Sequence, residues 1–466
     1  MFDVAVVGGG PVGMLLAAEL ALQQVSVVVL ERRAVPLTES KAGTLHARTA
    51  QSLDRRGLLT EVGHPTWGSV RFHFSGMFGL DLGAVAGDGP SIMGSPSAWA
   101  EHVFAERAEA LGATILRGQE VTGLVQHDGH VRLSNGVEAR YVVGADGARS
   151  AVRKAAGIPF VGMGARVAAL MGEVRLPPGL PGGYHRTPRG WLLVWPGGRI
   201  TTYDYRGPHA DKSAPVTLEE LREAAEHIAG FPIPMSEPRN LTRYGDASLQ
   251  AQTYRSGRVL LAGDAAHMHF PWGGQGLNTG LEDAFNLGWK LAAQVQGRAP
   301  DGLLDTYHAE RHPVAARVLW NVRAQNALAD PDPRMDPLRE LFAELMRFEE
   351  VNAYLSGMIS GVDTVYDVGV PGAGWMAPDL AIATDAGTVT LVELLRRGQP
   401  LFLDLNGRYD LVKVVGARAE VVSGKADSPY EALLIRPDGY VAWTSAAGPS
   451  AAGEETLAGA LDRWFL

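Results

Sequence analysis

The strongest restriction on the fold comes from residues 1–31, which read as strand, turn, helix and strand. Val4–Val7 is apolar and β-branched, and Pro11–Gln23 is a Leu- and Ala-rich helical segment. Between them Gly8-Gly9-Gly10-Pro11-Val12-Gly13 fits the pattern G-x-G-x-x-G, and the strand-like run Val25–Leu30 leads to Glu31. This order predicts the opening βαβ unit of a doubly wound sheet, with a pyrophosphate at the helix N-terminus and Glu31 on a ribose hydroxyl.

The glycine pattern is informative only in this context. Glycine supplies 57 of 466 residues, about 12% against a usual ~7%, so roughly 0.8 such matches are expected by chance in a chain of this length. A flanking strand, a following helix and an acidic residue about 20 positions on distinguish this match. The alternative is a glycine-rich turn in an α/β unit that binds nothing.

Two further turns carry a carboxylate just after a buried strand. Asp146 lies in Gly144–Ser150 after the strand Tyr141–Val143, and Asp264 lies in Gly263–His267 after Val259–Ala262. Open α/β sheets bind ligands beyond the carboxyl ends of their strands. A single Asp-Gly turn is usually only a turn, but two of them together with the glycine-rich start predict one shared ligand site.

Composition excludes several function classes. The chain has no cysteine, so disulfides, thiolate nucleophiles and iron–sulfur clusters are excluded, and no metal site is expected. A net charge of −9 disfavours nucleic-acid binding. The uncharged stretch from residue 4 to 18 is too short and glycine-rich to span a membrane. We therefore expect a cytoplasmic protein without nucleic-acid or membrane partners, either monomer or homodimer.

Residues 166–249 have a different character, with aromatic runs between turn glycines that predict an inserted antiparallel sheet. Trp191, Trp195, Tyr203 and Tyr205 alternate, so they are expected on one sheet face. That face is either the wall of an aromatic substrate cavity or an ordinary sheet core. Helices are expected at about 277–296 and 301–327, and Val370–Gly374 is typical of a linker into a last segment.

The three motifs in this order resemble those of single-component (class A) FAD-dependent aromatic hydroxylases with the para-hydroxybenzoate hydroxylase fold. Gly263–Asn278 (GDAAHMHFPWGGQGLN) is the most specific stretch. Pro371–Asp379 and Ala432–Trp443 are similar to the branch that hydroxylates aromatic polyketides and includes rifampicin monooxygenase. The resemblance implies an α/β fold with a Rossmann-like FAD-binding domain, an inserted antiparallel-sheet substrate domain and a C-terminal thioredoxin-like domain.

It also implies domain boundaries. A discontinuous FAD-binding domain is expected at 1–70, 97–165 and 250–330, and a substrate-binding domain at 71–96 and 166–249. A helical connection would occupy 331–369, and the thioredoxin-like domain 370–466. Because it has no cysteine, the last domain has no dithiol chemistry.

Carried over by position, the resemblance assigns cofactor-binding residues. Gly8, Gly10 and Gly13 would hold the pyrophosphate of FAD, Glu31 the ribose, Arg48 the phosphates and Asp264 the ribityl chain, while Asp146 would lie beside both FAD and NADPH. The full set of expected cofactor residues is Gly8, Gly10, Pro11, Val12, Gly13, Glu31, Arg32, Arg48, Asp146, Asp264, Pro271, Gly274, Gly276, Leu277 and Asn278. One departure is Ser97, where the family usually has glutamine.

The implied activity is hydroxylation of a large phenolic substrate with NADPH or NADH and O₂, through a flavin C4a-hydroperoxide. No residue is identified as a catalytic base. Two alternatives stay open: a flavin-binding protein that sequesters its substrate without oxygenation, and a flavin oxidase or dehydrogenase. A single G-x-G-x-x-G after a strand argues against a second, resident nicotinamide domain.

Overall fold

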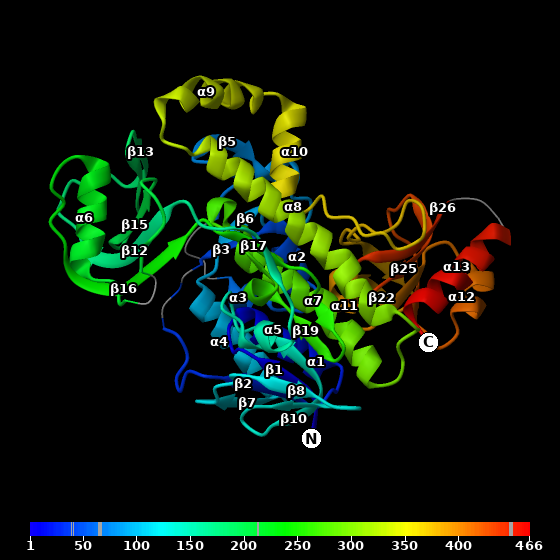
Figure 1. The fold of residues 1–466 in the computed structure, drawn as a ribbon. Helices are drawn as coiled ribbons and strands as arrows, with labels where there is room; N and C mark the ends of the chain where they lie inside the picture. The colour runs from blue at the N-terminus through cyan, green and yellow to red at the C-terminus, as the bar shows by residue number, and fades with distance from the viewer. Residues whose placement is uncertain (39, 41, 64–67, 212–213, 447–450) are drawn as a thin grey trace.

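The computed structural model describes residues 1–38, 40, 42–63, 68–211, 214–446 and 451–466. Figure 1 shows a central α/β region that holds the N-terminus, a sheet-rich region around α6 (Leu218–Ala229), and a C-terminal region that ends with α13 (Ala451–Trp464). Among the helices of these described residues, none is both long and apolar enough to cross a bilayer.

The central sheet has the strand order β18-β19-β10-β1-β2-β7, and all neighbours are parallel except β18 and β19. Its strands are β1 (Phe2–Val7), β2 (Val27–Glu31), β7 (Thr114–Arg117), β10 (Glu138–Gly144), β18 (Arg255–Ser256) and β19 (Val259–Leu261). β8 (Leu124–Gln126) and β9 (Val131–Leu133) extend it antiparallel from β10. The valine runs of β1 and β2 are buried because helices cover a parallel sheet on its faces.

Helix α1 (Pro11–Leu22) connects β1 to β2 and packs between α4 (Ser97–Ala110) and α7 (Gln275–Val295). It begins with Gly10 at the N-cap and Pro11 at the first helical position, where the missing N–H of proline costs no hydrogen bond. The shorter elements of this region are β3 (Thr44–His46), α2 (Ala47–Asp54), α3 (Leu59–Val62), β6 (Ile92–Gly94) and α5 (Ala151–Ala155).

The inserted sheet is antiparallel throughout, in the order β13-β14-β15-β12-β16. Its strands are β12 (Ala168–Arg175), β13 (Gly183–Thr187), β14 (Gly190–Val194), β15 (Arg199–Asp204) and β16 (Ser236–Gly245). One face packs on α6, and the other carries aromatic side chains toward the loop before α7. β11 (Phe160–Met163), β17 (Ser248–Ala251) and β20 (His267–Met268) form a small sheet that joins the two regions.

Beyond α7, the chain runs through the long helix α8 (Thr306–Leu328) to α9 (Asp336–Leu345) and α10 (Glu349–Ser360), which pack near the hairpin of β4 (Arg71–Phe74) and β5 (Met77–Asp81). The C-terminal region holds a mixed sheet in the order β24-β23-β25-β26. The helices and strands of this C-terminal region are β21 (Ala381–Thr384), β22 (Gly387–Thr390), α11 (Leu391–Leu395), β23 (Leu401–Asp404), α12 (Tyr409–Val415), β24 (Glu420–Ser423), β25 (Tyr430–Ile435), β26 (Val441–Ala446) and α13; β21 and β22 form a separate two-stranded sheet.

The predicted fold class is confirmed: a Rossmann-like domain with an inserted antiparallel sheet and a C-terminal domain. One expected strand is shorter than predicted. The run Glu120–Val125 pairs only from Leu124, because Thr122 donates its backbone N–H to the Ser134 hydroxyl at 3.0 Å instead of to a strand. The Ser134 side chain therefore takes the place of a backbone partner for this N–H group, and the regular strand pairing begins only after it.

Candidate functional site

Three turns meet at the carboxyl edge of the central sheet. β1, β10 and β19 are neighbours, so the turns that follow them lie side by side. A Cβ built on Gly8 would lie 2.3 Å from the carbonyl oxygen of Ala145. The side chain of Val12 lies 3.2 Å from a Cβ built on Gly263 and 2.7 Å from one built on Gly280 in α7. The three sequence motifs therefore form one site, at the place where parallel α/β sheets bind ligands.

The glycine-rich turn leaves an open face at one position. A Cβ on Gly13 would lie 2.0 Å from the Gly8 carbonyl oxygen, and Gly8 has φ 110°, so both positions require glycine. At Gly10, by contrast, a Cβ would meet no atom within 4 Å. Gly10 is the N-cap of α1, whose N-terminus carries partial positive charge. The protein thus packs around Gly8 and Gly13 and keeps the approach to Gly10 clear, which fits a pyrophosphate group.

Glu31 is held as a carboxylate beside this turn. One oxygen accepts the Gly9 N–H at 2.7 Å, and the other accepts the backbone and guanidinium N–H groups of Arg33 at 2.9 and 2.8 Å. Burial raises the pKa of Glu31, but the bonds from Arg33 and Gly9 outweigh it and hold the pKa below its usual value. Arg32, the expected cofactor residue, is exposed, and its role stays a prediction.

Asp146 has one carboxylate oxygen engaged and one without a partner. Oδ2 accepts the backbone N–H groups of Ala151 and Val152 at 2.7 and 3.2 Å, at the start of α5. Oδ1 is buried and has no hydrogen-bond partner. Since buried acceptors are seldom left unpaired in native proteins, this oxygen fits a contact with a bound donor group.

The turn at Gly263 is fixed by a buried carboxylate of α7. Asp283 accepts the Gly263 N–H at 3.0 Å and His267 Nε2–H at 2.7 Å through one oxygen, and Arg311 Nε–H at 2.8 Å through the other. Burial raises the pKa of Asp283, but His267 and Arg311 lower it below its usual value. His267 therefore has a structural role, and Asp264 is left exposed at the tip of this turn.

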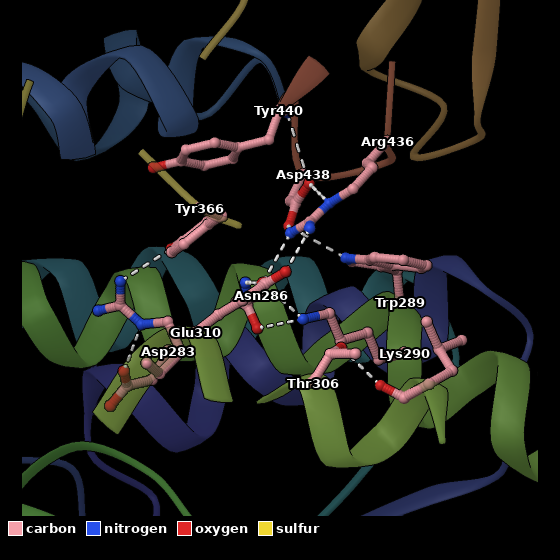
Figure 2. A network of polar contacts seen from close by, with 12 residues as sticks. Asp283, Asn286, Trp289, Lys290, Thr306, Glu310, Tyr366, Arg436, Asp438 and Tyr440 are labelled. Atoms are coloured by element: carbon pink, nitrogen blue, oxygen red, sulfur yellow. Dashed lines mark hydrogen bonds and ion pairs between the residues drawn. The ribbon is translucent and has the colours of Figure 1, made fainter. Parts of the chain in front are cut away.

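The same network continues into the C-terminal region (Figure 2). Arg311 donates to the hydroxyl of Tyr366 at 3.0 Å. Glu310, the residue before Arg311 on α8, accepts Lys290 Nζ at 2.7 Å and both terminal nitrogens of Arg436 at 2.6 and 2.9 Å. These groups are buried, so charged pairs join α7 and α8 to the turn between β25 and β26.

Two glycines in left-handed conformation start α7. Gly273 and Gly274 have φ 77° and 63°, conformations that favour glycine. The side chain of Asn278 accepts the His46 N–H at 2.8 Å and donates to the carbonyl oxygens of Thr44 and Gly274. Asn278 thus ties β3 to the first turn of α7. The contacts of Pro271, Gly274, Gly276, Leu277 and Asn278 with a flavin stay predictions.

Two neutral histidines flank this helix start. His46 bonds the Gly273 carbonyl oxygen through Nε2 at 2.7 Å, and His269 bonds the Phe270 carbonyl oxygen through Nδ1 at 2.8 Å. Burial lowers the pKa of each to about 4, so both rings are neutral near pH 7. A carbonyl only accepts, so His46 Nδ1 and His269 Nε2 keep lone pairs, and both atoms are buried without a partner. They are available acceptors for a hydroxyl or N–H group.

An aromatic wall rises from the inserted sheet beside this helix start. We define it as His73, Tyr184, Trp191, Tyr203, Phe270 and Trp272. Trp191 and Tyr203 face each other across β14 and β15, as the alternation predicts, and lie 5.4 Å from Trp272 by ring centroids. Both are buried, and Trp191 Nε1 donates to the Ala329 carbonyl at 2.7 Å. These two residues belong to the sheet core.

The other two expected substrate residues differ from this pair. Trp195 is 38% exposed and lies 5.3 Å from the ring of Tyr184. Tyr205 has a buried hydroxyl without a partner. Their contact with a substrate stays a prediction.

His73 and Tyr184 form a polar pair within the wall. The Gly76 N–H donates to His73 Nδ1 at 3.3 Å, which places the ring proton on Nε2. Nε2–H then donates to the Tyr184 oxygen at 3.1 Å, so the phenolic hydrogen of Tyr184 can be donated onward. Burial lowers the pKa of His73 to about 4 and raises that of Tyr184 above its usual value. Both side chains are therefore neutral near pH 7, and the Tyr184 hydroxyl is available as a hydrogen-bond donor among aromatic rings.

Two expected residues have other partners in the structure. Arg48 donates to the Gly361 and Val362 carbonyl oxygens and to Gln51, so these bonds do not support its expected contact with phosphates. Ser97 accepts the Ala42 N–H at 3.4 Å and donates its own N–H to the Ala42 carbonyl. Ser97 therefore holds the segment before β3 in place of a longer side chain.

Sequence reasoning missed several residues of the site. Arg33 follows Glu31 by two positions, and residues two apart in extended chain lie on the same side, so the sequence could have indicated the ion pair between them. His46, His73 and Tyr184 offered none, because each meets the site through contacts with segments far away in the sequence.

The chain is similar to known proteins over its whole length. Residues 1–322 match the family model of the FAD binding domain, and residues 370–465 match that of the aromatic-ring hydroxylase C-terminal domain. A 12-dehydrotetracycline 5-monooxygenase/anhydrotetracycline 6-monooxygenase of Streptomyces rimosus is 41% identical over 100% of this chain and 99% of its own. A rifampicin monooxygenase of Streptomyces venezuelae is 42% identical over 95% of each chain. The solved structure of OxyS anhydrotetracycline hydroxylase from Streptomyces rimosus superposes with a TM-score of 0.92, at 40% identity, over 100% of this chain and 99% of that one.

Proposed function

Because this chain belongs to the FAD-dependent aromatic-ring hydroxylases, we propose that it hydroxylates a large polycyclic phenol with O₂ and with NADPH or NADH as reductant. The observation that carries this proposal is the meeting of the three turns with the N-terminus of α7, directly beside the aromatic wall. FAD, when bound, supplies the hydride acceptor and the oxygen activation. The protein supplies binding, orientation and the exclusion of water.

The cofactor residues are assigned by their positions in this site. Gly10 and the N-terminus of α1 would hold the pyrophosphate, and Glu31 would bind the ribose. Asp264 at its exposed turn would bind the ribityl chain, and the unpaired oxygen of Asp146 would accept a hydrogen bond. The start of α7 after Gly274 would face the flavin ring, where its partial positive charge stabilises negative charge.

The substrate class rests on the relatives and on the wall. The two relatives are named for tetracycline intermediates and for rifampicin, which points to large polycyclic phenols. Of the aromatic wall only Tyr184 is more than slightly exposed, and the polar groups in and beside the wall are few and neutral: Tyr184 as donor, and His46 and His269 next to the wall as acceptors. These three neutral side chains can each form a hydrogen bond with a phenolic hydroxyl, so a phenol with several free hydroxyls fits them better than a charged substrate.

The test is NADPH and NADH consumption by the purified FAD-loaded protein, alone and with a panel of polycyclic phenols that includes rifamycins and anhydrotetracyclines. We expect slow consumption alone and a many-fold acceleration by one compound, with a product heavier by about 16 mass units, one oxygen atom. A bound compound of unchanged mass would instead support the sequestering protein. A product lighter by two hydrogens would support an oxidase or dehydrogenase. A flavin that neither nicotinamide reduces would contradict the proposal.

A further inference from the structure

A polar cavity lies between α7, α2, α8 and the segment 358–364. On α7 it is lined by Gln275, Asn278, Thr279 and Glu282, whose helical spacing puts them on one face. The volume of this cavity that water can occupy is about 50 Å³, and a cavity needs about 10–15 Å³ to hold one water molecule. The cavity therefore has room for a few waters along the first two turns of α7.

The walls of this cavity present unsatisfied polar atoms. Glu282 Oε1, Thr49 Oγ1 and the Tyr440 hydroxyl are buried and have no hydrogen-bond partner among the described residues. Buried polar atoms in native proteins are bonded to protein or to ordered water. Three such atoms around one space of this size indicate that water fills it.

The carboxyl of Glu282 is the titratable group of the cavity. The charged or ionisable groups that act on it are Arg48 from α2, Arg311 from α8, and Tyr366, Asp438 and Tyr440 from the C-terminal region. Both arginines direct their hydrogen bonds to other residues. Burial raises the pKa of Glu282 to about 7 although the two arginines lower it.

The cavity has one end at the surface and one at the candidate flavin site. At the surface end, Arg317 and Asp363 form an ion pair of 2.7 Å with side chains 39% and 30% exposed. At the inner end lies Gln275, the first residue of α7. Glu282 follows Gln275 by seven positions, a distance of about 10 Å along a helix.

We propose that Glu282 and this cavity form a proton-exchange site that couples bulk water to the charge at the N-terminus of α7. The inference rests on the proposed function, since it takes that N-terminus to be the flavin end. When negative charge is added there, Glu282 Oε1 takes up about half a proton on average near pH 7.5, which passes from bulk water through the Arg317–Asp363 mouth. When the charge is removed, the proton returns by the same route.

The size of the coupling follows from distance. A unit charge about 10 Å away at an effective dielectric constant of about 20 raises the pKa of a carboxyl by roughly one unit. Near pH 7.5 this corresponds to an uptake of about half a proton in addition to the proton that the flavin itself takes up on two-electron reduction to its anionic form.

The experiment is the midpoint potential of bound FAD as a function of pH between about pH 7 and 8.5, by spectroelectrochemistry. One proton per two electrons gives a slope of about 30 mV per pH unit. We expect about 45 mV per pH unit for the wild type near pH 7.5, and the one-proton slope for Glu282→Gln. Glu344→Gln, a change at an exposed residue of α9, is the matched control and should keep the wild-type slope.

Equal slopes for wild type and Glu282→Gln would overturn the proposal. Protein that binds no FAD would refute the proposed function instead, because no potential would then be measurable. If Glu282→Gln does not fold, infrared spectra of wild-type apoprotein at about pH 6 and pH 8 decide the question. The carbonyl band of a protonated carboxylic acid should fade between them, and its absence at both would overturn the proposal.

Discussion

Glu310→Gln tests whether the C-terminal region is fastened by charge. The carboxylate of Glu310 accepts hydrogen bonds from Asn286, Lys290 and both terminal nitrogens of Arg436, all buried. Burial raises the pKa of Glu310, yet Arg436 and Lys290 outweigh it and lower the pKa from 4.5 to about 2. At about 1.4 kcal/mol per pH unit, such a shift corresponds to a stabilisation on the order of 3 kcal/mol.

Glutamine keeps the size of the side chain but removes the anion of Lys290 and one of the two anions of Arg436, which keeps its buried ion pair with Asp438. Removing one partner of a buried pair costs about 3–5 kcal/mol, which agrees with the value from the pKa. Lys290 already has a pKa lowered to about 8, because burial and the nearby Arg436 outweigh its pairing with Glu310. Lys290 is therefore expected to lose its proton in the variant, while Arg436 stays charged.

Urea unfolding followed by tryptophan fluorescence measures this cost, because Trp289 and Trp464 flank the guanidinium of Arg436. At pH 7 we expect a loss of about 3–5 kcal/mol for Glu310→Gln, and less than about 1 kcal/mol for the exposed control Glu219→Gln. Since the pKa of Glu310 is lowered, its contribution is present above about pH 4.5 and is lost as the pH falls toward 2. The variant should lack that acid dependence. A loss below about 1 kcal/mol at pH 7 would refute the reasoning.

Three further predictions concern the cofactor and substrate sites. Gly13→Ala should lower the thermal midpoint and abolish FAD binding, because its Cβ would collide with Gly8. Gly10→Ala should unfold like wild type, because its Cβ meets no protein atom, yet bind FAD more weakly. Calorimetry measures the first effect and flavin absorbance the second, and full FAD binding by Gly10→Ala would exclude a pyrophosphate at Gly10. Glu31→Gln should weaken FAD binding about 10- to 100-fold, as a lost charge-assisted bond costs about 1.5–3 kcal/mol, and an unchanged Kd in a fluorescence titration would remove Glu31 from the ribose site. Tyr184→Phe should leave folding intact and weaken binding of the activating phenol about fivefold, about 1 kcal/mol; unchanged affinity would show that the Tyr184 hydroxyl does not contact the substrate.

Local patterns were sufficient for the central site. The glycine turn, the two Asp turns and the helix after Gly274 each follow a buried strand or a marked glycine run, and parallel strands bring such turns to one edge. The inserted sheet was also predictable, because Trp191 with Trp195 and Tyr203 with Tyr205 alternate within their own runs, and the two strands pair so that Trp191 lies opposite Tyr203. Whether that face formed a cavity or a core depended on the loop at Trp272, which the alternation does not report.

Pairings between distant segments could not be predicted. Glu310 and Arg436 are 126 positions apart, and Arg48 meets the carbonyl of Val362 across 314. Charged residues with ordinary spacing give no periodic signal for such contacts. The assignment of Arg48 to the phosphates came from resemblance alone, and its observed bonds depend on where the segment 358–364 packs.

The link from Gly263 through Asp283 and Arg311 to Tyr366 has a consequence for biosynthesis. Synthesis proceeds from the N-terminus, so the glycine-rich turn leaves the ribosome several hundred residues before Arg436. Tyr366, Arg436 and Asp438, which complete the buried polar contacts of α7 and α8, are made later than both helices. Nascent chains should therefore bind flavin tightly only near the end of translation. A chain truncated before Arg436 should aggregate, because the buried face of α7 and α8 would be exposed and Glu310 would keep Lys290 as its cation but lack Arg436.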